Sequence, residues 1–180
     1  MITLALPFHR KAKVWVGELP AAVYLAERSV KHVLEAKPSF SKTVHRGAVE
    51  LCIPTGPRSI YGLLGAEFNQ DESDKIRITV NISSDRGQQF VASLAGTSDD
   101  VRIGLPEEYV NGVLGGVTLA REQIGHLLSG DLVFNCAAHG LTGSSELIFK
   151  YASSIVLNIL ILNNDEWTAD ELAPLFQLRF

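Results

Sequence analysis

The segment from residue 144 to 162 limits the fold most, because it is typical of a long helix that is apolar around most of its surface. Its polar residues fall on one stripe, at Lys150, Ser154 and Asn158. Such a helix is stable in water only when other elements cover more than one of its sides. The chain must therefore supply a layer of other structure against which this helix packs.

Strand patterns precede this helix. In residues 74–82 every second side chain is apolar, which is the period of a strand with one buried face. Turn-forming residues then separate two further expected strands, one at 89–94 and one that ends near Val117. The pair Gly115-Gly116 in the last of these permits a close approach of that strand to the next helix.

An amphipathic helix is expected next, with Thr118 as its cap and Gly130 as its end. The short apolar run at 132–138 predicts a fourth strand. Because both helices have apolar sides, we expect them on the same face of one sheet.

The N-terminal part has a different pattern. Residues 12–16 are expected to form a strand, and 42–53 another. Between them, residues 20–36 place apolar side chains at helical spacing, which predicts an amphipathic helix.

An acidic, turn-forming run at 69–74 is the clearest internal boundary. It divides the chain into a β-α-β extension over residues 1–70 and an α+β domain with a C-terminal tail over residues 71–180.

Composition and net charge argue against some classes of function. The chain of 180 residues has a net charge of −4, which argues against sequence-independent binding of DNA or RNA but leaves a local RNA contact open. The longest apolar run is shorter than the roughly 20 residues that span a bilayer, and no signal peptide is evident. We expect a soluble cytoplasmic protein with no membrane partner. Cys52 and Cys136 are interpreted as buried thiols, and no Cys/His pattern indicates a metal or cofactor.

Three stretches in order carry a family resemblance: "DRGQQF" (85–90), "EEYVNGVLGGV" (107–117) and "HGLTGSSELIFKYASS" (139–154). With them, residues 74–162 resemble the fourth domain of translation elongation factor G, which has a ribosomal-protein-five-like fold. The resemblance implies an α+β, two-layer sandwich with a left-handed βαβ crossover, to which the N-terminal part adds an α/β extension.

The family's domain presents two tip loops to the ribosome, so the resemblance implies a non-enzymatic interaction domain with a protein or ribonucleoprotein partner. It predicts partner contacts from the two loops, at Arg86, Gln88, His139, Thr142 and Ser144. Of these, Arg86 and His139 are expected to be exposed at the same end of the sheet. The sequence has no GxxxxGK[ST] motif, so we do not expect it to carry the family's nucleotide-hydrolysing function.

Two alternatives stay open. One is an acidic protein-binding module unrelated to translation. The other is a small phosphate-binding enzyme that uses residues 140–145, where the start of a helix offers Gly143, Ser144 and Ser145 to an anion. No nucleophile, base and orienting residue can be assembled from the sequence, which favours binding over catalysis.

The tail also carries signals. Thr168 and Glu171 have the spacing of a capping box, and Pro174 should bend or break the helix that starts there. We expect its apolar side chains to pack on residues 20–36 or to form a homodimer or partner interface; they are Leu172, Leu175, Phe176, Leu178 and Phe180.

Overall fold

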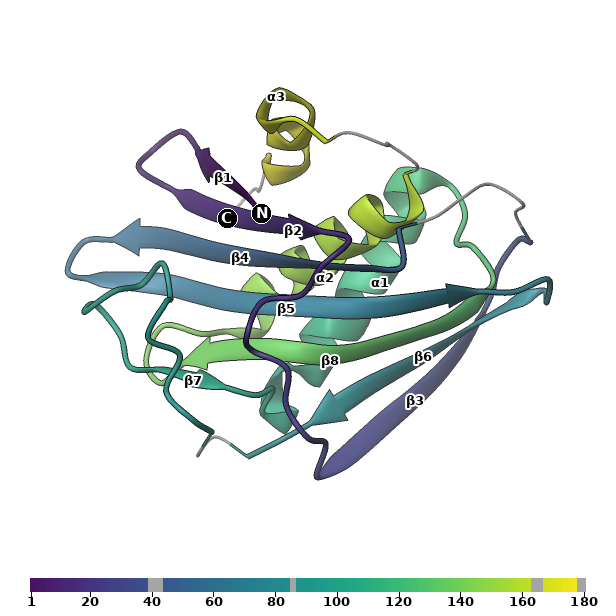
Figure 1. The fold of residues 1–180 in the computed structure, drawn as a ribbon, viewed down its shortest axis with the longest axis horizontal. Helices are drawn as coiled ribbons and strands as arrows, with labels where there is room; N and C mark the ends of the chain where they lie inside the picture. Colours follow the sequence, from purple (N-terminus) through teal and green to yellow (C-terminus); the bar gives the residue numbers. More distant parts are fainter. Residues whose placement is uncertain (39–43, 85–86, 163–166, 178–180) are drawn as a thin grey trace.

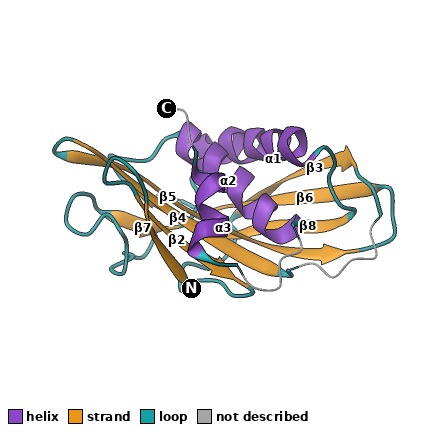
Figure 2. Ribbon diagram, turned by 90° about the horizontal axis from the view of Figure 1, so that it is seen from above, coloured by secondary structure: helices purple, strands orange, loops and turns teal. Residues whose placement is uncertain are grey.

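The computed structural model describes residues 1–38, 44–84, 87–162 and 167–177, which form a large mixed sheet with helices on one face (Figures 1 and 2). The strands follow the order β1-β2-β4-β5-β8-β6-β3, and β7 pairs with the end of β8. Their bounds are β1 Ile2–Ala5, β2 Lys11–Val16, β3 Arg28–Glu35, β4 Arg46–Thr55, β5 Arg58–Gln70, β6 Lys75–Ile82, β7 Val101–Ile103 and β8 Gly130–Gly140.

Two long helices, α1 (Val110–Ile124) and α2 (Glu146–Ile161), lie side by side on one face of the sheet (Figure 2). A 3-10 turn, η1 (Glu107–Tyr109), leads into α1. The α+β class and the shared face of the two helices are therefore as predicted. The apolar side of α2 and the inner faces of β4, β5, β6 and β8 form the main core.

Several local predictions are confirmed. In β6, Ile76, Ile78, Val80 and Ile82 are buried at alternate positions, as a strand with one buried face requires. The strands predicted at 12–16, 42–53 and 132–138 correspond to β2, β4 and β8, and the helix predicted at 144–162 is α2.

The helix predicted at residues 20–36 is wrong. Residues 17–27 form a loop, and residues 28–35 form the edge strand β3, which pairs with β6. Val30 lies opposite Val80 and Leu34 opposite Ile76, so both pack at the margin of the core. Apolar residues four positions apart fit one face of a strand as well as one face of a helix. The pairing with β6 selects the strand.

Two strand predictions are also wrong. Residues 91–100 form turns rather than a strand at 89–94, and the residues up to Val117 belong to α1. Thr118 consequently lies inside α1 and does not cap it. The helix ends at Gly125, whose φ is +87°, whereas Gly130 begins β8.

The parts before and after residue 71 contribute to the same sheet. Among the described residues before that position the structure has the strands β1 to β5 and no helix, so a β-α-β extension is not what forms there. β8 is hydrogen-bonded to β5 on one side and to β6 on the other. The acidic run at 69–74 includes the turn that joins β5 to β6.

The sheet face away from the helices has its own smaller core. Loops 17–27 and 87–100 cross this face and cover Tyr61, Leu63 and Cys136. Both cysteines are buried and unpaired, as predicted.

The tail folds against the first strand. Thr168 and Glu171 make the predicted capping box at the start of α3 (Ala169–Leu172), and the 3-10 turn η2 (Ala173–Phe176) follows at Pro174. Leu172 and Phe176 are buried in the main core, and α3 contacts β1. The predicted contact with a helix at 20–36 is wrong because that helix does not form. Leu178 and Phe180 lie outside the described residues.

The close approach expected at the glycine pair takes place between two helices. A Cβ on Gly116 would lie 2.3 Å from the Lys150 carbonyl oxygen and 2.5 Å from Ser153 Cβ, both on α2. A Cβ on Gly115 would meet nothing nearer than Lys150 Cδ at 3.7 Å, an ordinary contact. Only the second glycine is therefore required by packing.

We predict that Gly116→Ala lowers the free energy of unfolding by about 1–3 kcal/mol, because the helices must separate to admit the methyl group. Gly115→Ala is the matched control, and it should be neutral or stabilise by up to about 1 kcal/mol through helix propensity. Urea denaturation of both variants measures the difference. Equal stability of the two would show that α1 and α2 pack too loosely to exclude a methyl group.

Candidate functional site

The loops that follow β6 and β8 leave the sheet at the same end, because these two strands are parallel neighbours. The residues before α1 and before α2 lie there too. We call this region the loop end and define it as residues 83–84, 87–88, 104–108 and 140–145. In sheets with parallel strands, ligands commonly bind beyond the carboxyl ends of those strands. The loop end is therefore the candidate binding site.

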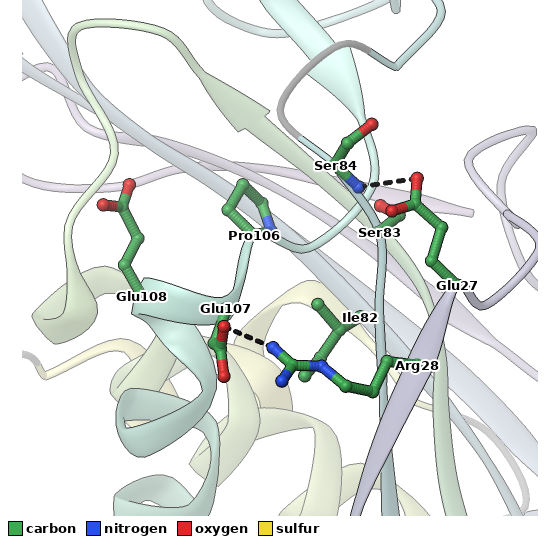
Figure 3. A pocket seen from close by; sticks show the side chains of 8 residues that line it. All are labelled: Glu27, Arg28, Ile82, Ser83, Ser84, Pro106, Glu107 and Glu108. Atoms are coloured by element: carbon green, nitrogen blue, oxygen red, sulfur yellow. Dashed lines mark hydrogen bonds and ion pairs between the residues drawn. The ribbon is translucent and has the colours of Figure 1, made fainter.

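A cavity of about 360 Å³ opens at the loop end (Figure 3). Arg28 at the start of β3 forms an ion pair with Glu107, and the Glu27 carboxylate accepts a hydrogen bond of 3.1 Å from the Ser84 N–H. Because the side chains of Arg28 and Glu107 are exposed, their ion pair stabilises the fold by about 1 kcal/mol or less. The lining is Glu27, Arg28, Ile82, Ser83, Ser84, Pro106, Glu107 and Glu108.

The charges of this cavity are predominantly negative, with three carboxylates against one guanidinium. Glu108 hydrogen-bonds the Tyr109 hydroxyl, and burial, followed by this carboxylate, raises the pKa of Tyr109 above its usual range. Figure 3 shows Glu108 on the other side of Pro106 from Glu27. The cavity is thus better suited to a cationic group than to a phosphate.

Asp99 joins the segment 87–100 to residues 140–145 of the loop end. Its carboxylate accepts hydrogen bonds from the Gly143 N–H at 2.8 Å, the Thr142 N–H at 3.2 Å and the Thr142 hydroxyl at 3.1 Å. A Cβ on Gly140 would lie 2.0 Å from Asp99 Oδ2, so the glycine leaves the space that this carboxylate occupies. The backbone donors predicted to bind an external anion are therefore engaged by a carboxylate of the chain itself.

The two predicted serines also have internal partners. Ser144 Oγ accepts from the Gly140 N–H at 2.9 Å and donates to the Tyr61 carbonyl at 2.7 Å. Ser145 caps α2 by accepting from the Ile148 N–H at 3.4 Å. Both serines shape the loop and the start of α2.

His139 is not an exposed loop residue, and that expectation is wrong. It belongs to β8 and is only 2% exposed, with Nδ1 3.1 Å from the Gly104 carbonyl oxygen and its ring beside Tyr109. Gln88 and Thr142, two of the predicted contact residues, are exposed. Arg86 lies outside the described residues.

A buried carboxylate holds the loop that carries Gln88 against the sheet. Glu50, on β4, is fully buried, and its Oε1 accepts from the Leu94 N–H at 2.7 Å and from the Tyr61 hydroxyl at 2.9 Å. Lys13 lies 3.4 Å from the other Glu50 oxygen and donates to the Ala92 carbonyl at 3.0 Å. Burial, and then Glu50, raise the pKa of Tyr61 well above its usual range, so the Tyr61 hydroxyl stays protonated and keeps its role as a donor.

Sequence reasoning missed Asp99, Glu50 and the acidic lining of the cavity. Glu107 and Glu108 were within a stretch singled out for its resemblance, but nothing local distinguishes them from solvated charges. An acidic residue inside an apolar strand, as Glu50 is in "AVELCI", is the one signal that could have been used.

The chain matches no protein-family model and no curated protein. Within the described ranges, no group of three or more His, Cys, Asp or Glu side chains could hold a metal ion. None of the described helices is long and apolar enough to cross a membrane.

We predict that Asp99→Ala lowers the free energy of unfolding by about 1–3 kcal/mol, because the partly buried N–H of Gly143 and the two exposed donors of Thr142 lose their acceptor. Val91→Ala is the control in the segment 87–100 that carries Asp99, and it should change stability by no more than about 0.5 kcal/mol because that side chain is 84% exposed. Chemical denaturation compares them. If Asp99→Ala is as stable as the control, Asp99 does not hold the loop.

Proposed function

We propose that this chain is a non-enzymatic interaction domain whose loop end presents Gln88 and residues 140–145 to a macromolecular partner. The observation that carries the proposal is the hydrogen bonding of Asp99, which ties residues 142–143 to the segment that follows Gln88. Two exposed loops fixed to each other form a surface of constant shape, and such preorganisation favours specific binding.

The resemblance to the fourth domain of elongation factor G makes a ribosome the first partner to test. In support, the connection between two parallel neighbouring strands, β6 and β8, contains the helix α1 after the short strand β7, and both long helices cover one face of the sheet. We propose the two-layer sandwich with a left-handed βαβ crossover on the same basis. A fold of this kind hosts several functions, so the partner rests on the loops rather than on the fold.

One observation favours the acidic protein-binding module as a second candidate. Glu27, Glu107 and Glu108 gather at the cavity of the loop end, where they would repel the phosphates of RNA and attract a basic protein segment. The phosphate-binding enzyme is less well supported, because a phosphate would have to displace Asp99 from Thr142 and Gly143.

The test compares binding by wild type and by Gln88→Ala/Leu141→Ala, two exposed positions on the two loops. In co-sedimentation with purified ribosomes we expect the double variant to bind at least tenfold more weakly, with an unchanged melting temperature. Glu72→Ala/Lys75→Ala, at the turn between β5 and β6 at the opposite end, is the matched control and should bind as wild type does.

A photo-crosslinking residue in place of Gln88 separates the two candidates. Crosslinks to ribosomal components support the ribosomal partner, and crosslinks to one non-ribosomal protein support the acidic module. Equal crosslinking from position 72 and position 88 would contradict a binding role for the loop end.

A further inference from the structure

The charge of this acidic chain is unevenly distributed. Segments 1–17 and 51–66 contain no Asp or Glu, although the whole chain has a net charge of −4. The same two segments carry a group of basic side chains: His9, Arg10, Lys11, Lys13 and Arg58.

The fold brings these segments together. Lys11 at the start of β2 lies opposite Cys52 on β4, so the turn between β1 and β2 extends alongside the turn between β4 and β5. Both turns lie at the left end of the sheet in Figure 1. We call the surface formed by Phe8, His9, Arg10, Lys11 and Arg58 the basic tip.

Phe8, the aromatic residue of the basic tip, has an uncommon backbone conformation. Its side chain is 82% exposed, and both Phe8 and His9 have left-handed backbone angles, with φ of +62° and +59°. These angles are uncommon for residues other than glycine, and they cost conformational energy. The guanidinium of Arg10 lies over the Phe8 ring, 5.6 Å from its centroid. A large exposed aromatic side chain on a strained backbone is better explained by binding than by stability.

The surroundings of Phe8 suit a flat, partly apolar group. A cavity of about 450 Å³ adjoins the turn, with mainly apolar walls that include Leu6, Pro174 and Phe176. Asp170 is the acidic residue of its lining. Positively charged groups around an exposed aromatic ring are the features with which proteins bind unpaired nucleotides.

We propose that the basic tip binds single-stranded nucleic acid, with phosphates beside Arg10, Lys11 and Arg58 and one base stacked on Phe8. The net negative charge of the chain does not oppose this, because charges act over a Debye length of about 8–10 Å at physiological salt. The tip lies outside the cavity and the residues of the loop end, so this site goes beyond the proposed function.

Fluorescence anisotropy with a labelled mixed-sequence RNA of about 12 nucleotides tests the proposal, with DNA of the same sequence as a second arm. We expect wild type to bind at low salt and Arg10→Ala/Lys11→Ala/Arg58→Ala to bind at least tenfold more weakly. The slope of log affinity against log salt should become shallower by about 2, because each phosphate that the variant no longer neutralises accounts for about 0.7.

Lys31→Ala/Arg46→Ala/Arg121→Ala is the matched control, because it removes three exposed basic side chains elsewhere and changes net charge equally. It should bind as wild type does. If the two triple variants lose affinity equally, net charge alone explains the loss and the proposed site is wrong. Tighter binding of RNA than of DNA would show that the protein contacts the 2′-hydroxyl. Equal binding of the two would show that it contacts phosphates and bases only.

Phe8→Gly separates binding from folding. Glycine adopts a φ of +62° without strain, so the melting temperature should be unchanged or higher, whereas affinity should fall about tenfold because the base has no ring to stack on. Phe8→Trp should retain binding. The proposal fails if Phe8→Gly binds as tightly as wild type, if wild type binds neither oligonucleotide, or if only anionic lipid vesicles bind to the tip.

Discussion

The position of β8 between β5 and β6 is the constraint on which the rest of the fold depends. β5 and β6 follow each other with only a short turn between them, yet each is hydrogen-bonded to β8, a strand that begins nearly fifty residues later. Until β8 is in place, the two strands lack their shared neighbour. Long-range pairing of this kind must overcome the entropy of closing a long loop.

Electrostatic contacts hold the beginning of β8 in place at the end of the sheet opposite to the loop end. Arg77 on β6 donates to Asp131 on β8 at 2.6 and 3.0 Å and also pairs with Asp71 in the turn after β5. The hydrogen bonds from Arg77 and Ser73 lower the pKa of Asp71 to about 2. One guanidinium thereby joins β6, β8 and the turn after β5. The parallel register of β6 and β8 then places both following loops at one end.

The predictions that succeeded are those in which a local signal and the tertiary environment agree. The alternation in β6, the apolar surface of α2 and the capping box at Thr168 each describe what the structure contains, and each depends on neighbours in sequence. The loop end is different, because its geometry depends on contacts between residues far apart in the chain. Asp99 and Thr142 are 43 residues apart, and no local pattern relates them.

The failures have a common physical origin in tertiary contacts that override local preference. Residues 110–117 contain three glycines, which disfavour a helix, but Gly112 and Gly116 are required where α1 approaches α2. Residues 28–35 have apolar spacing compatible with a helix, but pairing with β6 makes them a strand. His139 was expected in a loop, whereas β8 continues to Gly140 and buries it. In each case the deciding partner is distant in sequence.

Charge distribution shows why net charge is a poor guide to the partner of this chain. The cavity of the loop end gathers Glu27, Glu107 and Glu108, whereas the basic tip gathers Arg10, Lys11 and Arg58 on the other side of the same end of the sheet. Because salt screens charges over about 8–10 Å, each region interacts with a partner largely on its own. A partner with a single type of charge would therefore be attracted by one region and would interact little with the other. A ribonucleoprotein, which carries both phosphates and basic side chains, would complement both regions at once, and this complementarity is independent of the family resemblance.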